Sequence, residues 1–399
     1  MTAIEGPDTT ERVWSARRVG PLTIEWRGQR TLAGWSDDVV TVGIGAIGAA
    51  AMYWDSWRHN GKAIASDGFW SPPHILLYVA LGAVGYWIGL IVLRRQQPGF
   101  KALNLAAIPR GYGIGMVGLA LAGVGGIGDY IWHAIFGFED QVNAFWSPPH
   151  QLLFLGGTLV VTAPLVSSWY RHDGPLDARS AVPVVGSLAL IMSTATYALT
   201  HLSPLWNNLA PTPAFQQQLT RFDDAYPAGD LGPGHVGLDV AVRNLGDSSF
   251  PYYFHTLNHS VASFLLLSIT LVAPVLFLVR RWSPPPGAVA VIFGLYGLVA
   301  SIPTEFRDIE LVAGLVVAGA VIDVLIARLQ PALPSRPWQF RAIGALVPPL
   351  SIGGYLLALE VLGAGLAWGI SIWLGVMITA GIIGLGLACL MAPPSTGAR

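Results

Sequence analysis

Two short stretches of this chain are almost identical. Residues 68–78 read GFWSPPHILLY and residues 144–154 read AFWSPPHQLLF, so FWSPPH occurs twice. Each copy ends in a histidine, His74 in the first and His150 in the second. Histidine is a frequent metal ligand and proton carrier, so the repeated motif marks a place where chemistry can occur.

An Asp-x-x-x-His pattern precedes each copy of the motif. Asp55 with His59 precedes the first copy, and Asp129 with His133 precedes the second. Both the aspartates and these histidines are 74 residues apart, and the two FWSPPH histidines are 76 residues apart. Offsets this constant over three polar positions indicate that a helical hairpin has been duplicated.

The spacing predicts that the polar residues of each hairpin converge. Residues four apart lie on one face of a helix. Ser71 and Ser147 suit the N-cap position, and the prolines after them suit the first helical turn. One carboxylate and two imidazoles form a ligand set for Cu(II), Zn(II) or non-haem Fe(II). The sequence therefore predicts two metal sites, made by Asp55, His59 and His74 and by Asp129, His133 and His150.

A purely structural interpretation of the same residues is the alternative. In this interpretation, Ser-Pro-Pro has no role beyond starting a helix, and Phe-Trp has no role beyond forming an interfacial aromatic belt. An Asp–His pair can simply hydrogen-bond at a helix end. The recurrence of the whole set favours metal binding by at least one hairpin. Because duplicated sites drift, one copy can be functional while the other is structural.

The two triads resemble the metal-site pattern in the C subunit of the copper membrane monooxygenases, which oxidise methane or ammonia. The resemblance covers Asp129, His133 and His150, or their first-hairpin equivalents, and no other part of the chain. The gap before the last histidine is longer here, and the triad occurs twice. The resemblance implies a copper-type ligand set, so copper is the favoured metal, with zinc and iron as alternatives.

Three of the histidines that follow the second hairpin are further candidate ligands. His201 ends an apolar segment, and His255 and His259 lie four apart near the start of the next one. Together they suggest a third, degenerate hairpin that completes a metal site or forms its own. Hydrated first-turn histidines are the alternative. The chain has one cysteine, Cys389, and six methionines, so we expect neither a thiolate cluster nor a Cu(I) thioether pathway.

The composition places these residues in a membrane protein. Hydrophobic residues make up 53% of the chain and charged residues 11%, against a usual charged share of about 25%. The formal net charge of −1 gives no electrostatic case for nucleic-acid binding. Residues 1–37 are polar and lack the apolar core of a cleaved signal.

Hydropathy predicts an all-α, polytopic integral membrane bundle of about ten spanning helices, built from repeated helical hairpins. The expected spans are residues 38–59, 72–93, 112–133, 148–169, 181–201, 252–279, 287–303, 306–327, 341–361 and 365–391. The expected units are a cytoplasmic segment 1–37, a first hairpin 38–93, a second hairpin 112–169, a degenerate third hairpin 181–279 with an outer loop 202–251, a C-terminal four-helix part 287–391 and a cytoplasmic tail 392–399.

The basic residues predict the orientation. With ten spans, 17 of the 22 Lys and Arg residues fall on the side that holds both termini. The positive-inside rule then places both termini in the cytoplasm of a cell-membrane protein. Eight of the nine histidines fall at the opposite, outer side.

Three functions are compatible with these features. The first is a metal-dependent membrane oxidoreductase, monooxygenase-like, acting on a small or lipophilic substrate. The second is a transporter or metal-uptake protein. The third is a haem- or pigment-binding subunit of a membrane complex. Besides the lipid bilayer and a small-molecule or ion substrate, the sequence allows partner membrane subunits and does not identify them.

Overall fold

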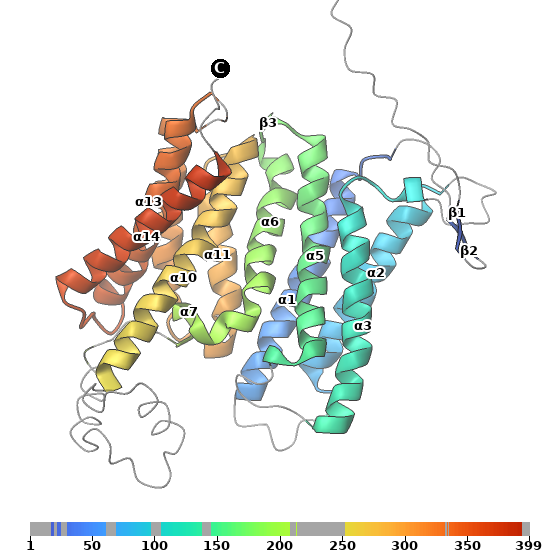
Figure 1. Cartoon of the computed structure of the whole chain (residues 1–399), viewed down its shortest axis with the longest axis horizontal. Coiled ribbons are helices and arrows are strands. Elements are labelled where there is room, and N and C mark those ends of the chain that lie inside the picture. Colours follow the sequence, from blue (N-terminus) through green and yellow to red (C-terminus); the bar gives the residue numbers. More distant parts are fainter. Residues whose placement is uncertain are drawn as a thin grey trace, which may run out of the picture.

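The protein is a bundle of long helices (Figure 1). A computed structural model describes residues 17–19, 22–24, 30–60, 69–96, 105–137, 145–207, 213, 252–331, 333 and 335–392; the side chains of 17–19, 22–24, 59–60 and 252–256 lie outside this description. The long helices are α1 (Trp35–Asn60), α2 (Pro72–Leu93), α3 (Tyr112–Phe136), α5 (Pro148–Arg171), α6 (Ala178–Ala195), α10 (Tyr252–Arg281), α11 (Ala288–Ala300), α12 (Ile309–Leu329), α13 (Pro337–Val361) and α14 (Ile370–Met391). The all-α prediction is therefore confirmed.

Short elements join these helices. The helical ones are η2 (Leu105–Ala107), η3 (Tyr197–Leu202), α7 (Pro204–Asn207) and η4 (Ile302–Thr304). Strands β1 (Arg17–Val19) and β2 (Leu22–Ile24) pair antiparallel, and β3 (Gly174–Pro175) and β4 (Trp282–Ser283) pair parallel. The β3–β4 pair ties the carboxyl ends of α5 and α10 together.

Nine helices in the described part of the chain are long and apolar enough to cross a membrane. The chain is therefore a multi-pass membrane protein by length and composition. The predicted span 287–303 corresponds to α11, which has 13 residues. At about 1.5 Å per residue, α11 alone is shorter than the roughly 30 Å hydrocarbon core of a bilayer.

The outer face of α3 suits contact with lipid. Val117, Val124, Ile127, Ile131 and Ile135 on this helix are each at least half exposed. A soluble protein rarely exposes an apolar stripe of this length. In a bilayer the same stripe would face acyl chains, as the composition predicts.

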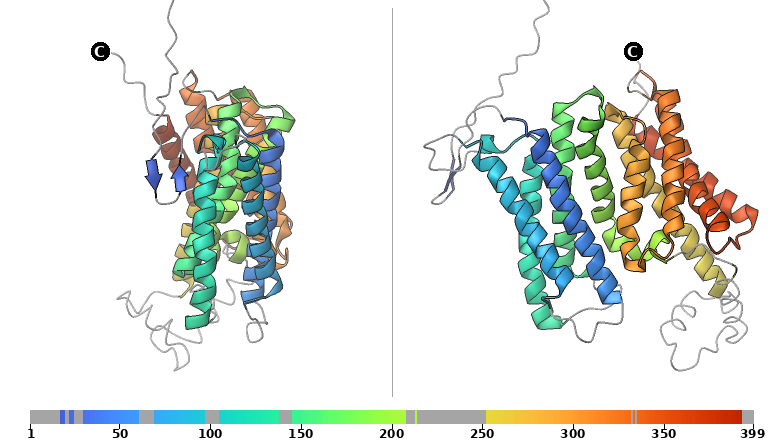
Figure 2. Two further views of the ribbon diagram at one scale, coloured as in Figure 1. Left: turned by 90° about the vertical axis from the view of Figure 1, so that its right-hand side faces the viewer. Right: turned by 180° about the vertical axis from the view of Figure 1, so that it is seen from behind.

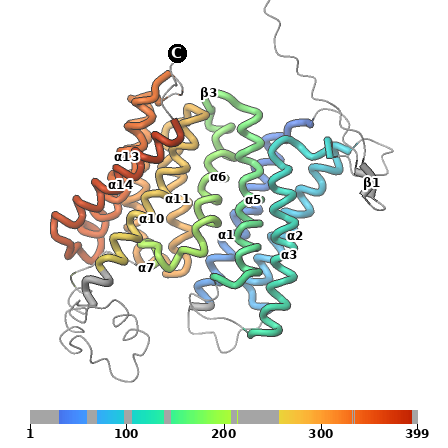
Figure 3. Tube along the Cα trace, in the orientation of Figure 1, coloured from blue at the N-terminus to red at the C-terminus, as the bar shows by residue number. Residues whose placement is uncertain are grey.

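The helices form two groups (Figures 1 and 3). Helices α1, α2, α3 and α5 form one group, in which the α1–α2 hairpin stacks against the α3–α5 hairpin (Figure 2). Helices α10, α12, α13 and α14 form the other group, and α6 packs against α11 between them. The C-terminal group has a dense core with fully buried Phe264, Phe340 and Tyr355.

Glycines let α3 and α5 approach closely. A Cβ atom added to Gly118 would lie 2.6 Å from the carbonyl oxygen of Gly156, and one added to Gly156 would lie 2.6 Å from the backbone nitrogen of Ala122. Any larger residue would push the helices apart. Small residues at such contacts are the usual means of close helix packing within membranes.

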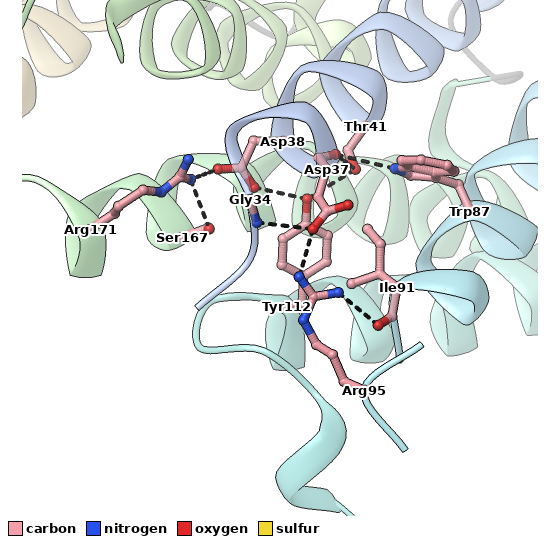
Figure 4. Close-up of polar contacts among 10 residues, drawn as sticks. All are labelled: Gly34, Asp37, Asp38, Thr41, Trp87, Ile91, Arg95, Tyr112, Ser167 and Arg171. Atoms are coloured by element: carbon pink, nitrogen blue, oxygen red, sulfur yellow. Dashed lines mark hydrogen bonds and ion pairs between the residues drawn. The ribbon is translucent and has the colours of Figure 1, made fainter. Parts of the chain in front are cut away.

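A buried ionic network closes the end of the first group that lies opposite the FWSPPH motifs (Figure 4). Asp38, in the first turn of α1, is fully buried and pairs with Arg171 at the end of α5. The hydroxyl of Tyr112, the first residue of α3, donates to Asp38 Oδ1 at 2.9 Å. The neighbouring Asp37 pairs with Arg95, which follows α2, at 2.7 Å. All four helices of the group are thus joined by two carboxylates.

Candidate metal site

Both FWSPPH motifs start a helix, as predicted. Ser71 and Ser147 occupy the N-cap positions of α2 and α5 with extended backbone angles, and the prolines fill the first turn. Neither serine hydroxyl caps its helix by a side-chain hydrogen bond. The Ser147 hydroxyl instead lies 2.7 Å from His150 Nδ1. The motif therefore sets both the helix start and the orientation of one imidazole.

The second hairpin brings its three predicted ligands together. His133, one turn after Asp129 on α3, has its Nε2 atom 3.2 Å from Asp129 Oδ1. His150 reaches the same oxygen from α5, with its Nε2 atom at 2.9 Å. The three ligand atoms all lie within 4.8 Å of one another, a separation suited to a single metal ion. Asp129 is 1% exposed, so the group is shielded from solvent.

The first hairpin brings two of its predicted ligands together. His74 Nε2 lies 3.3 Å from Asp55 Oδ2, and the His74 side chain is 5% exposed. This contact matches the one between His150 and Asp129 in the second hairpin. The side chain of His59 lies outside the described residues, so the prediction for this residue is not tested.

The polar residues of the two hairpins meet at one place. Tyr78, one turn after His74 on α2, donates its hydroxyl to Asp129 Oδ2 at 2.7 Å. The ring centroids of His74 and His133 are 6.3 Å apart, and the ring of Phe69 packs against both. The sequence predicted one cluster per hairpin, whereas the structure places both sets of residues side by side.

These residues form the polar end of a cavity inside the first helix group. The cavity has a volume of about 140 Å³. Its polar lining includes Asp55, Asp129 and the three histidines of the two clusters, and no Lys or Arg is among the described residues that line it. Most of the remaining wall is apolar and comes from α1, α2 and α5, with residues such as Ile44, Met52, Leu77, Leu81 and Val160.

The hydrogen bonds on Nδ1 decide what the Nε2 atoms can do. His133 Nδ1 lies 3.1 Å from the carbonyl oxygen of Gly137. A carbonyl oxygen only accepts hydrogen bonds, so Nδ1 carries the proton and the neutral imidazole has its lone pair on Nε2. That lone pair faces the Asp129 carboxylate. Two acceptors in contact require a cation, either a metal ion or a second proton on the ring.

The same arrangement is the usual support for a metal-binding histidine. Such a histidine donates its second ring N–H to a backbone carbonyl, carboxylate or water, which fixes its tautomer and orientation. His133 does so toward Gly137, and His150 can do so toward Ser147. Tyr78 in turn holds the Asp129 carboxylate. Both the ligand atoms and their supports therefore fit a bound cation.

Of the three later histidines, His201 and His259 are not part of this group. Helix α6 ends at Ala195, earlier than the predicted 201, and His201 lies in the following η3. Its ring packs against Phe145, which lines the cavity, at a centroid distance of 6.4 Å. Burial lowers the pKa of His201 below its ordinary value, and nearby His259 acts in the same direction. His259 is exposed, and the side chain of His255 lies outside the described residues.

Sequence reasoning missed Tyr78 and Phe69. A signal for Tyr78 was present, because it lies four residues after His74 and therefore on the same helical face. The equivalent position of the second hairpin is Phe154, which stacks on His150 with ring centroids 6.0 Å apart. The two hairpins therefore differ chemically at this position, because Tyr78 carries a hydroxyl group and Phe154 does not.

Comparisons with known proteins give no relative. No family model matches the chain, and no curated protein or solved structure is significantly similar to it. The function must therefore be argued from the site.

Proposed function

We propose that this protein is a multi-pass membrane metalloprotein that uses a transition-metal ion for oxidoreductase chemistry on a small, lipophilic substrate. The observation that carries the proposal is the group of Asp129, His133 and His150, whose ligand atoms lie within 4.8 Å of one another at the end of a cavity. The support of His133 Nδ1 by a backbone carbonyl adds to it.

The ligand set limits the metal. Two imidazoles and one carboxylate suit Cu(II), Zn(II) or non-haem Fe(II), and copper is favoured by the motif resemblance. A redox-active metal of this kind would supply electron transfer at the polar end of the cavity. The protein's own residues would hold it, with Tyr78 fixing Asp129 and with Ser147 fixing His150.

The cavity indicates the substrate class. Its wall beyond the ligands is mostly apolar and lacks described Lys or Arg residues, so a charged molecule would be poorly solvated there. An apolar cavity of about 150 Å³ holds benzene or xenon in another protein. A compact, uncharged molecule of about this size therefore fits the 140 Å³ space.

The orientation completes the proposal. If α11 and the η4 segment form a tenth crossing, both termini lie on the same side of the membrane. That side carries most of the basic residues, so the positive-inside rule identifies it as the cytoplasm. The start of α1 and the end of α14 lie at the same end of the bundle (Figure 1). The metal site would then face the outer side of a cell membrane, within reach of substrates dissolved in lipid.

The other two hypotheses have less support. A transporter usually binds its substrate near the middle of the membrane, whereas Asp129 lies near the end of α3. A haem or similar pigment is much larger than a cavity of about 140 Å³. Uptake of radioactive metal by proteoliposomes would favour transport, and a Soret band would favour haem.

Metal titration tests the proposal. The metal-stripped, full-length protein should take up Cu(II) or Zn(II) saturably, with at least one equivalent bound. Uptake should weaken as the pH falls, because protons compete for the imidazoles and the carboxylate. Calorimetry and elemental analysis measure the two quantities. Protein that takes up no ion from either solution would contradict the proposal.

The cavity is tested separately by filling it. Gly157 lines the cavity, and a Cβ atom added there meets no atom within 4 Å. Gly157→Leu should weaken the binding of xenon or benzene by about tenfold or more, while metal uptake stays unchanged. Gly123→Leu is the control, because that position is equally open and faces outward. If both variants bind xenon and benzene equally well, the cavity is not the place where these probes bind.

A further inference from the structure

We infer that Asp55 and His74 bind a second metal ion beside the first, so that the cavity ends in a two-metal centre. The inference rests on the proposed function for the site at Asp129. It concerns residues of the first hairpin, whereas Asp129, His133 and His150 all belong to the second hairpin.

The tautomer of His74 supports the second site. His74 Nδ1 lies 3.1 Å from the carbonyl oxygen of Phe69, so Nδ1 carries the proton and donates it. The Nε2 lone pair of the neutral ring then faces Asp55 Oδ2 at 3.3 Å. This is the arrangement of His133 with Gly137 and Asp129. A cation next to Nε2 and Oδ2 turns the contact between two acceptors into a pair of ligands.

The two carboxylates that line the cavity also favour a second cation. Asp55 and Asp129 both line it, their side chains are 14% and 1% exposed, and no described lining residue is Lys or Arg. A carboxylate in such surroundings is costly unless a positive charge compensates it. One divalent ion at Asp129 would leave the Asp55 carboxylate beside a neutral His74 ring, and a second cation between Asp55 Oδ2 and His74 Nε2 would compensate its charge.

The two sites would be coupled through the helices they share. Tyr78, one turn after His74 on α2, holds the Asp129 carboxylate of the first site. The His74 and His133 rings have centroids 6.3 Å apart. Ions bound at the two groups would therefore be neighbours, as in enzymes that use a pair of metal ions. The site at Asp55 has two described ligands rather than three, so we expect it to fill second.

Copper titration with electron paramagnetic resonance tests the inference. The full-length wild-type protein should bind two equivalents of Cu(II). The signal should be that of an isolated ion at one equivalent, and spin coupling should broaden it at two. Asp55→Asn and His74→Gln should each bind one equivalent, with the signal of an isolated ion throughout. His172→Gln is the matched control, because His172 follows the opposite end of α5, and it should keep two equivalents.

Each outcome separates the two proposals. A wild-type protein that binds one equivalent and is unaffected by both variants would overturn the second site and leave the first in place. A wild-type protein that binds no copper would overturn both. The broadened signal at two equivalents is measured on the wild type, so the result does not depend on whether either variant folds.

Discussion

Replacement of Asp129 by Asn should abolish tight metal binding while leaving the protein folded. Asp129 Oδ1 is shared by His133 and His150, at 3.2 and 2.9 Å, so removing its charge affects the whole group. Removing a residue that hydrogen-bonds to a metal ligand typically lowers the metal affinity 10–100-fold. Loss of this shared ligand should therefore raise the Kd by more than about 100-fold.

The same substitution should remove the stabilisation that metal confers. A metal ion at 100 times its Kd stabilises a protein by about 2.7 kcal/mol, so wild-type protein should melt at a higher temperature with metal than without. Asp129→Asn should show almost no such difference. Asp173→Asn is the control, because that carboxylate is largely exposed and pairs with Arg281 away from the cavity. Wild-type affinity in Asp129→Asn would mean that the metal binds elsewhere.

Replacement of Arg171 by Met should strongly destabilise the first helix group. It leaves the fully buried Asp38 with the Tyr112 hydroxyl but without its cation (Figure 4). Removing one partner of a buried ion pair typically costs about 3–5 kcal/mol. Denaturant unfolding in detergent measures the loss.

A double variant shows whether the missing charge is the cause. Asp38→Asn combined with Arg171→Met removes both charges, so it should be clearly more stable than Arg171→Met alone. Arg94→Met is the control, because Arg94 is exposed and lies over the Trp87 ring. A double variant as unstable as the sum of its two single variants would show that the pair is not coupled.

The local part of the site could be predicted from the sequence. Asp129 and His133 are four residues apart, and Ser-Pro-Pro fixes where α5 begins, so helix geometry together with the α3–α5 hairpin brings His150 close to them. The span positions followed from hydropathy in the same way. These predictions succeed because each depends on residues close together along the chain or on a single helical hairpin.

Contacts between hairpins could not be predicted in this way. The contact between Tyr78 and Asp129 depends on how the α1–α2 hairpin stacks on the α3–α5 hairpin. The pairing of Asp38 with Arg171 joins residues 133 positions apart. The early end of α6, where the chain continues as η3, was also not predicted from the apolar pattern.

The two hairpins combine similar residues in different surroundings. His74 has Tyr78 one turn later, and His150 has Phe154 at the equivalent position. Only the tyrosine can donate to a carboxylate, and it donates to Asp129 of the other hairpin. The first hairpin thus supports the candidate metal-binding group of the second through this hydrogen bond.

X-ray absorption spectroscopy of the copper-loaded protein identifies the atoms that bind the metal. The proposed metal ligands are imidazole nitrogens and carboxylate oxygens, which lie at about 2.0–2.2 Å in comparable sites. The spectrum should show these scatterers together with the outer-shell pattern of at least two imidazoles, and Asp129→Asn should lose it. A spectrum dominated by sulfur at about 2.3 Å, or one that Asp129→Asn leaves unchanged, would show that Asp129 and its two histidines do not bind the metal.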